Sequence, residues 1–181
     1  MKWVPLMGWI AILVVASTPF SVRAADGERC TPELPSHLAK DVARLYPQHR
    51  IVTLGDLSND DQRIWKTSYP NACVGIVLGR FSTSSDQIAL LLRPADGLSR
   101  ETKVILVGRT AGAGMPREIF SEGKTGNLPV LRRSKPGTYK NVQSGQRLRS
   151  HRDVLLVEHL EATVTALIVQ ESRVRVVPIA D

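Results

Sequence analysis

The sequence lacks the short motifs that mark most catalytic and metal centres. It has no Gly-x-Ser-x-Gly stretch of the kind that holds a hydrolase nucleophile. It also has no His-x-x-x-His, no Cys-x-x-Cys and no calcium loop of alternating acids. We therefore expect no catalytic residue, metal or cofactor of a recognisable kind. An enzyme whose site is assembled from distant residues, such as Asp153, Glu158 and a histidine, stays open as an alternative.

A glycine-rich stretch at 108–114 has the spacing of a dinucleotide-binding loop. That chemistry needs a helix directly after the glycines, so that the helix N-terminus meets the pyrophosphate. Here Pro116 follows almost at once, and no helical pattern comes after it. The stretch therefore predicts a flexible loop and not a nucleotide site.

Long apolar runs are also missing. After residue 24 the longest uninterrupted run is Ile88–Leu92, whereas a transmembrane helix needs roughly 20 apolar residues. The apolar run Trp9–Ala16 follows Lys2 and precedes Val22–Ala24, which is the order of a signal peptide with an A-x-A-like cleavage site. We predict that residues 1–24 are a cleaved signal peptide, with an uncleaved membrane anchor as the alternative, and that residues 25–181 form one periplasmic or secreted domain. No transmembrane segment would remain after cleavage.

The chain has only two cysteines, Cys30 and Cys73. An even pair in an oxidising compartment predicts a disulfide between them, with buried free thiols as the alternative. Neither cysteine has another Cys or a His at ligand spacing, so the pair does not indicate a metal site.

Periodicity changes along the chain from helical to extended. Leu34, Leu38, Val42 and Leu45 recur at helical spacing and predict a helix over 35–46, and the N-cap-like Ser58 predicts a second helix over 58–68. The apolar runs after them predict strands, which lie at 74–81, 87–92, 102–107, 154–158, 163–170 and 173–179, with weak ones at 118–121 and 129–132. Helices followed by strands predict a single α+β domain, in which two N-terminal helices pack on a mainly antiparallel sheet or meander.

Acidic residues are absent from one long segment. Between Lys124 and Arg152 there is no Asp or Glu, and eight basic residues lie there: Lys124, Arg132, Arg133, Lys135, Lys140, Arg147, Arg149 and Arg152. The full chain carries a net charge of +7, which falls to +5 without Lys2 and Arg23. The rest of the mature chain then sums to −3, so the domain is strongly polarised. A basic patch attracts acidic partners.

These eight residues are the candidate anion-binding residues, although a solvated loop that keeps the protein soluble is the alternative. Outside the cytoplasm the partners would be an anionic envelope polymer, lipid head groups or an acidic protein. Nucleic acid is not favoured, because Tyr139 is the only aromatic residue in the segment and single-strand binders use stacking platforms.

Several stretches resemble an uncharacterised family of exported bacterial proteins. They are Thr53–Trp65, Cys73–Gly75, Gly79–Phe81, Asp86–Leu92 and Pro136–Tyr139, together with the terminal strands after Asp153. In that family the strand after the cysteine leads into an acidic, glycine-rich turn similar to the calcium loops of FG-GAP repeats. Here the FG-GAP-like strand-turn-strand segment is weak, because Arg80 stands where the first Asp would be and Ser82–Ser85 replace the acidic turn. The resemblance implies a fold and a compartment, and no activity.

The leading hypothesis from the sequence is a non-enzymatic extracytoplasmic domain that binds anionic envelope components through its basic segment. A periplasmic inhibitor of a secreted enzyme is a second hypothesis. The positive charge of the domain disfavours basic target enzymes such as lysozymes, because like potentials slow the encounter of two proteins. Acidic target enzymes remain possible. An enzyme with an unrecognised site is the third.

Overall fold

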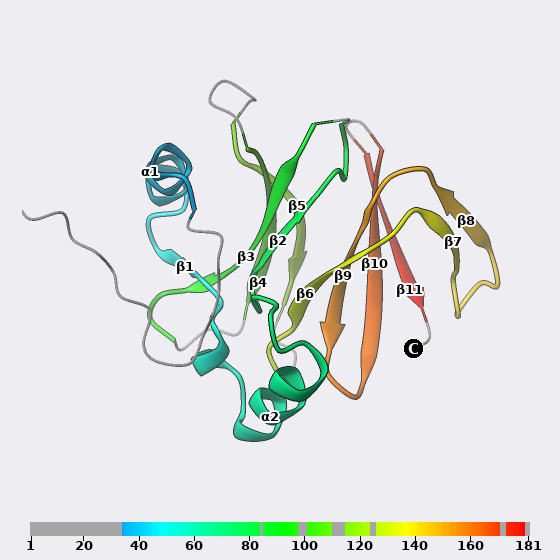
Figure 1. The fold of residues 1–181 in the computed structure, drawn as a ribbon, viewed down its shortest axis with the longest axis horizontal. Helices are drawn as coiled ribbons and strands as arrows, with labels where there is room; N and C mark the ends of the chain where they lie inside the picture. Colours follow the sequence, from blue (N-terminus) through cyan, green and yellow to red (C-terminus); the bar gives the residue numbers. More distant parts are fainter. Residues whose placement is uncertain are drawn as a thin grey trace, which may run out of the picture.

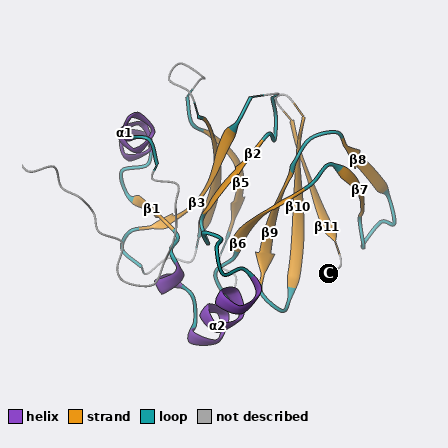
Figure 2. Ribbon diagram, viewed as in Figure 1, coloured by secondary structure: helices purple, strands orange, loops and turns teal. Residues whose placement is uncertain are grey.

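The computed structural model describes residues 34–83, 85–97, 101–109, 115–123, 126–170 and 173–179. Strands hold 47% of these residues and helices hold 17%, and Figure 2 shows strands through the whole centre of the molecule. The protein is therefore mostly β, with several antiparallel sheets. The predicted α+β arrangement, with two N-terminal helices on one sheet or meander, is wrong.

The first sheet is five-stranded and antiparallel, and one edge of its strand β3 is shared by two short strands. The strands are β1 (His49–Ile51), β2 (Ile76–Gly79), β3 (Gln87–Pro94), β4 (Thr102–Gly108) and β5 (Arg117–Glu122). β1 pairs with the end of β3 and β2 with its beginning. The chain leaves this edge after Val52 and rejoins it at Gly75, where an added Cβ would lie 2.3 Å from the carbonyl oxygen of Val52. Only glycine fits this approach of two backbones.

The second sheet is antiparallel, with four strands in the order β11-β10-β9-β6. They are β6 (Val130–Ser134), β9 (Val154–His159), β10 (Thr163–Gln170) and β11 (Arg173–Ile179). A separate hairpin is formed by β7 (Gly137–Lys140) and β8 (Arg147–Ser150). The amide of Leu131 donates to the carbonyl of Val74 at 2.8 Å, which ties the second sheet to the start of β2.

The main core lies between the two sheets, and each outer face has its own cover (Figure 1). Helix α1 (Ser36–Leu45) places Leu38 and Val42 on the outer face of the first sheet. The β7–β8 hairpin places Tyr139 and Leu148 against the outer face of the second. The order of layers is therefore helix, sheet, sheet and hairpin.

This layering explains why the predicted fold class failed. Residues 87–93 of β3 are all buried, and Leu90 packs toward α1 while its neighbour Leu91 packs into the core between the sheets. A strand that is apolar on both faces needs a layer on each side. A single sheet covered by two helices would leave much of the second half of the chain without a partner.

The two helices themselves begin and end close to where the sequence predicts them. α2 (Asn59–Ser68) is capped by the Ser58 hydroxyl, which accepts a hydrogen bond from the Asp61 amide at 3.1 Å. A short 3-10 turn, η1 (Leu54–Asp56), precedes it. α2 does not lie on a sheet face; it closes one end of the sandwich, with Trp65 only 2% exposed in the main core (Figure 1). In the described part of the chain, no helix is long and apolar enough to cross a bilayer.

The predicted signal peptide and Cys30 lie outside the described residues, as do Gly112 and Gly114 of the glycine-rich stretch. Cys73 is buried, with 7% of its surface exposed. Both the cleavage after residue 24 and the disulfide stay predictions.

Candidate anion-binding surface

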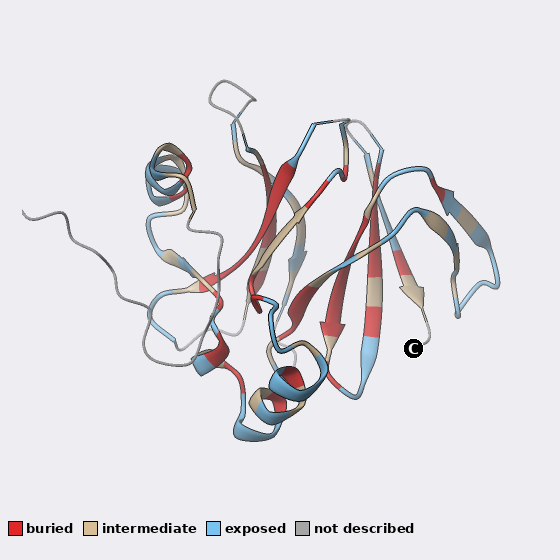
Figure 3. Ribbon diagram, viewed as in Figure 1, coloured by how far each residue is buried: buried red, intermediate tan, exposed pale blue. Residues whose placement is uncertain are grey.

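The basic segment forms strands for much of its length, so its charges point in different directions. β6, β7 and β8 all lie within it, whereas the sequence predicts only a weak strand at 129–132. Figure 3 shows the central strands largely buried and the β7–β8 hairpin mostly exposed or partly exposed. Lys124 lies outside the described residues.

Arg132 is turned inward and already has a counter-charge. Its guanidinium forms an ion pair with Glu158, whose side chain is only 8% exposed. It also donates a hydrogen bond to the Tyr69 hydroxyl, and its Cζ lies 4.7 Å from the centre of the Tyr69 ring. Arg132 therefore holds α2 against the second sheet and adds little to a solvent-facing surface.

The hairpin carries the densest exposed positive charge of the segment. Lys140 stands directly opposite Arg147, and Thr138 stands opposite Arg149, while Tyr139 pairs with Leu148 between them. Because side chains alternate along a strand, Tyr139 and Leu148 point to the core and the cations point to solvent.

Lys140, Arg147 and Arg149 together are called the hairpin face below. All three are exposed. None of them forms an ion pair with a carboxylate in the described part of the chain. Like charges directly opposite each other in a β ladder are destabilising, so the pairing of Lys140 with Arg147 has no structural benefit of its own.

A polar pocket of about 390 Å³ lies at the base of the hairpin. It is called the basal cleft and is lined by Arg80, Thr83, Pro136, His151, Arg152 and Asp153. Pro136 directly precedes β7 and His151 directly follows β8, so the cleft continues the hairpin at its fixed end. The carboxylate of Asp153 accepts a hydrogen bond from the Arg80 amide at 2.9 Å.

The basal cleft adds residues that the sequence does not single out. Arg80 stands out there only as a departure from an acidic turn, and His151 only as part of a basic loop. Asp153 is bonded to a backbone amide, and no carboxylate of the described residues forms an ion pair with the Arg80 or Arg152 guanidinium.

Arg133 and Lys135 connect these two features along the chain. Arg133 is exposed, and its guanidinium donates to the Leu78 carbonyl at 3.4 Å, which holds the side chain over the end of β2. Lys135 is exposed as well, and its carbonyl accepts a hydrogen bond from the Tyr139 hydroxyl at 2.6 Å. Both residues therefore lie next to the base of the hairpin.

The groups considered for an enzymatic site are only partly brought together. His151 and Asp153 line the same cleft, but no hydrogen bond joins their side chains in the described structure. Glu158 faces Arg132, and the His159 ring lies between Glu122 Oε2 at 3.0 Å and the Asn127 carbonyl at 3.1 Å. The cleft thus offers charge and hydrogen-bond donors, without a hydrogen-bonded nucleophile and base.

The described residues include no group of three or more His, Cys, Asp or Glu that could hold a metal ion.

Comparison with family models, curated proteins and solved structures finds no match to this chain. The resemblance to an exported bacterial family, and the FG-GAP-like segment within it, therefore stay predictions.

Proposed function

We propose that this chain is an exported, non-enzymatic domain that binds anionic polymers of the cell envelope through the hairpin face and the basal cleft. The observation that carries the proposal is the ladder pair of Lys140 and Arg147, exposed and without a carboxylate partner among the described residues. Arg149 lies two ladder positions further along, opposite Thr138, and so belongs to the same face.

The hairpin face sits on a well-anchored element. Tyr139 packs into the outer core of the second sheet. Its hydroxyl donates to the Lys135 carbonyl and shares a hydrogen bond with the Ser134 hydroxyl at 2.8 Å. Leu148 packs beside it. Cations fixed on a packed strand lose less freedom on binding than cations on a loose loop, which favours a binding role.

A flexible anionic polymer fits this surface better than a membrane does. Interfacial binding needs a sizeable apolar face that enters the head-group region. The outward side of the hairpin presents Thr138, Lys140, Arg147 and Arg149. Of the large apolar side chains that are exposed in the described structure, only Val142 lies on the hairpin. A linear polyanion can follow the row of cations and continue into the basal cleft.

Export is part of the proposal. The order of residues 1–24 supports signal-peptide cleavage, and an oxidising compartment would let Cys30 pair with Cys73. N-terminal sequencing of the secreted protein should then begin at Ala25. Retention of Met1 on the protein outside the cytoplasm would contradict this part.

Retention on immobilised heparin tests the binding proposal. We compare the unmodified protein with Arg147→Gln/Arg149→Gln and with a matched variant, Lys40→Gln/Lys66→Gln, which removes the same charge from exposed positions on α1 and α2. A cation near an anionic surface contributes about 1 kcal/mol. Loss of two from the face should weaken binding about 30-fold at low salt.

The hairpin variant should elute at clearly lower salt than the helix variant. Elution of the two variants at the same salt concentration would show that net charge alone governs retention, and the proposal would fail. Far-UV circular dichroism of both variants checks that the fold is kept.

A further inference from the structure

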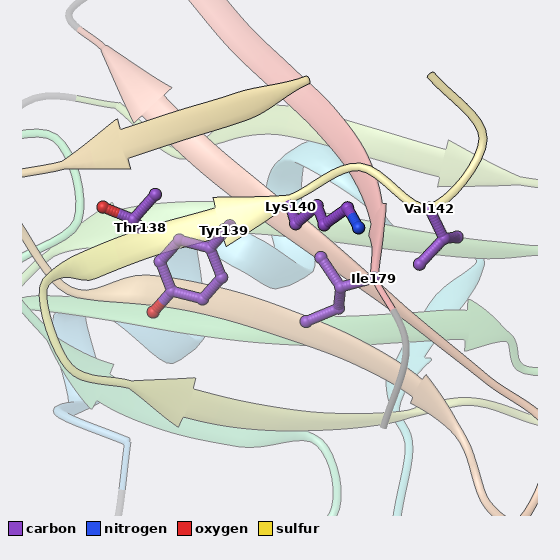
Figure 4. Close-up of a pocket in the computed structure, with 5 residues that line it drawn as sticks. All are labelled: Thr138, Tyr139, Lys140, Val142 and Ile179. Carbon is purple, nitrogen blue, oxygen red and sulfur yellow. The ribbon is translucent and has the colours of Figure 1, made fainter. Parts of the chain in front are cut away.

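A second pocket lies beside the hairpin, along the edge of β7 that does not pair with β8. Its volume is about 370 Å³, within the range of small-ligand sites. It is lined by Thr138, Tyr139, Lys140, Val142 and Ile179 (Figure 4). It is called the edge pocket below, and it is distinct from the basal cleft, with which it shares no lining residue.

The β7 backbone presents polar groups to the edge pocket. The Asn141 amide donates to the Gln146 carbonyl at 2.8 Å, which makes this a hydrogen-bonded pair of the hairpin. In an antiparallel ladder, hydrogen-bonded pairs alternate with pairs that are not hydrogen-bonded. Tyr139 and Leu148 therefore form a hydrogen-bonded pair, while Thr138 and Lys140 turn their N–H and C=O groups away from β8. Those donors and acceptors face the side on which the pocket lies.

The side chains give the pocket an amphipathic wall. The Tyr139 ring is held by its hydroxyl contacts to Ser134 and Lys135, and Val142 and Ile179 supply aliphatic surface. Figure 4 shows the Lys140 side chain extending beside Ile179. A sugar ring matches this combination, because its C–H face packs on aromatic and aliphatic carbon while its hydroxyls bond to backbone groups. A lysine at the same place favours a sugar that carries an anionic group such as a carboxylate.

We infer that the edge pocket binds a uronate unit of an acidic polysaccharide. This inference rests on the proposed function, because it names the kind of polymer that the hairpin face would hold. Lys140 belongs to both the edge pocket and the hairpin face. One polysaccharide chain could therefore place a sugar ring in the pocket and extend its other charges along the hairpin face.

The alternative occupant of an open strand edge is an added peptide strand. The edge of β7 is short for that purpose, because only Thr138 and Lys140 present outward backbone groups. Just beyond them the Val142 amide is already bonded to the Pro178 carbonyl at 3.0 Å. The pocket therefore suits a compact ring better than an extended peptide.

Titration calorimetry at low ionic strength tests the inference with two probes, trigalacturonate and its neutral methyl ester. The protein variants are Val142→Glu and the matched control Val176→Glu. Val142 and Val176 are 51% and 49% exposed, so neither substitution buries a charge, and only Val142 lines the pocket. A carboxylate placed in the pocket repels the bound uronate, whereas one on β11 only lowers the net charge.

We expect Val142→Glu to weaken trigalacturonate binding at least about tenfold, and Val176→Glu to bind within about twofold of the unmodified protein. The methyl ester should bind far more weakly than the acid. Equal losses in the two glutamate variants, or equal binding of acid and ester, would overturn the inference.

Heparin retention separates the two proposals. Hairpin-dependent retention without trigalacturonate binding would reject the uronate pocket and leave the proposed function intact. If Arg147→Gln/Arg149→Gln binds trigalacturonate and is retained on heparin as the unmodified protein is, the proposal that the hairpin face binds anionic polymers is rejected.

Discussion

Asp56 joins β1, η1 and β3 through a dense set of hydrogen bonds. Both terminal nitrogens of Arg50 donate to its carboxylate. The amide and hydroxyl of Thr53 donate to Oδ2 at 2.8 and 3.0 Å, and Arg93 donates to Oδ1 at 3.2 Å. The Asp56 side chain is 7% exposed and that of Arg93 10% exposed, so these two charges are nearly buried, whereas the Arg50 side chain is 42% exposed. Replacement of Asp56 by asparagine keeps its shape and removes its charge.

The pKa of Asp56 sets the expected magnitude. Burial alone would raise this pKa, but the hydrogen bonds from Arg50 and Thr53 outweigh it and lower the pKa from 3.8 to about 2. The difference corresponds to about 2 kcal/mol of folding free energy. Because the folded pKa lies below the unfolded one, this contribution is complete above about pH 5 and is lost as the pH falls toward 2.

The assay is urea unfolding followed by tryptophan fluorescence at several pH values. Trp65 is the only tryptophan after residue 24 and lies in the main core, so it reports on global unfolding. At pH 7 Asp56→Asn should lose about 2 kcal/mol or more, since Arg93 is left buried without its counter-charge. The gap to the unmodified protein should narrow by about 2 kcal/mol between pH 5 and pH 2.

Asp86→Asn is the matched control. It removes an exposed carboxylate that pairs with Arg109 at 3.5 Å, with the two side chains 61% and 54% exposed. Exposed pairs contribute at most about 1 kcal/mol. Equal losses of stability in the two variants, or the full acid dependence of the unmodified protein in Asp56→Asn, would show that Asp56 is not a stabilising buried charge.

Three further perturbations test other parts of the fold. Gly75→Ala places a Cβ 2.3 Å from a backbone carbonyl oxygen and should lower the free energy of unfolding in urea by about 1–3 kcal/mol or more. Its control, Gly55→Ala, has no atom within 4 Å of the new Cβ, so its free energy of unfolding should change by less than about 1 kcal/mol. Glu158→Gln removes the buried charge that pairs with the Arg132 guanidinium and should lower the free energy of unfolding by about 3–5 kcal/mol in the same assay. A loss under about 1 kcal/mol would show that the pair is not a buried charge interaction. If Cys30 and Cys73 form a disulfide, the unreduced protein should resist alkylation and should lose about 4 kcal/mol or less on reduction; rapid labelling of both thiols without a reductant would reject the bridge.

Local patterns in the sequence predict much of the secondary structure. The strands at 154–158, 163–170 and 173–179 are found as β9, β10 and β11, with at most one residue of difference at an end. Caps and periodicity likewise place both helices. The arrangement of the sheets was not predictable in this way, because a run such as that of β3 has no alternation to show which residues face which layer. That information lies in contacts with distant strands.

The hairpin was missed for a different reason. Each of its strands carries a single inward apolar residue, Tyr139 or Leu148, so the alternation is too short to distinguish it from a polar loop. A turn signal was nevertheless present. The Asn141 side chain accepts hydrogen bonds from the two amides at positions 143 and 144, and Gly145 has a φ of +70°, a conformation that glycine adopts readily. A turn at 141–146 would have predicted the pairing of its flanks.

The separation of inward and outward residues on this hairpin links stability to the proposed function. Tyr139 and Leu148 hold the hairpin on the second sheet, while Lys140, Arg147 and Arg149 have no ion-pair partner among the described residues. The like-charged pair across the ladder opposes folding by a fraction of a kcal/mol to about 1 kcal/mol. An anion bound between these cations would remove that repulsion and add its own attraction. Neutral substitutions on the face should therefore leave the fold intact, or even stabilise it, while they weaken binding, which is the opposite of what a structural role for these residues requires.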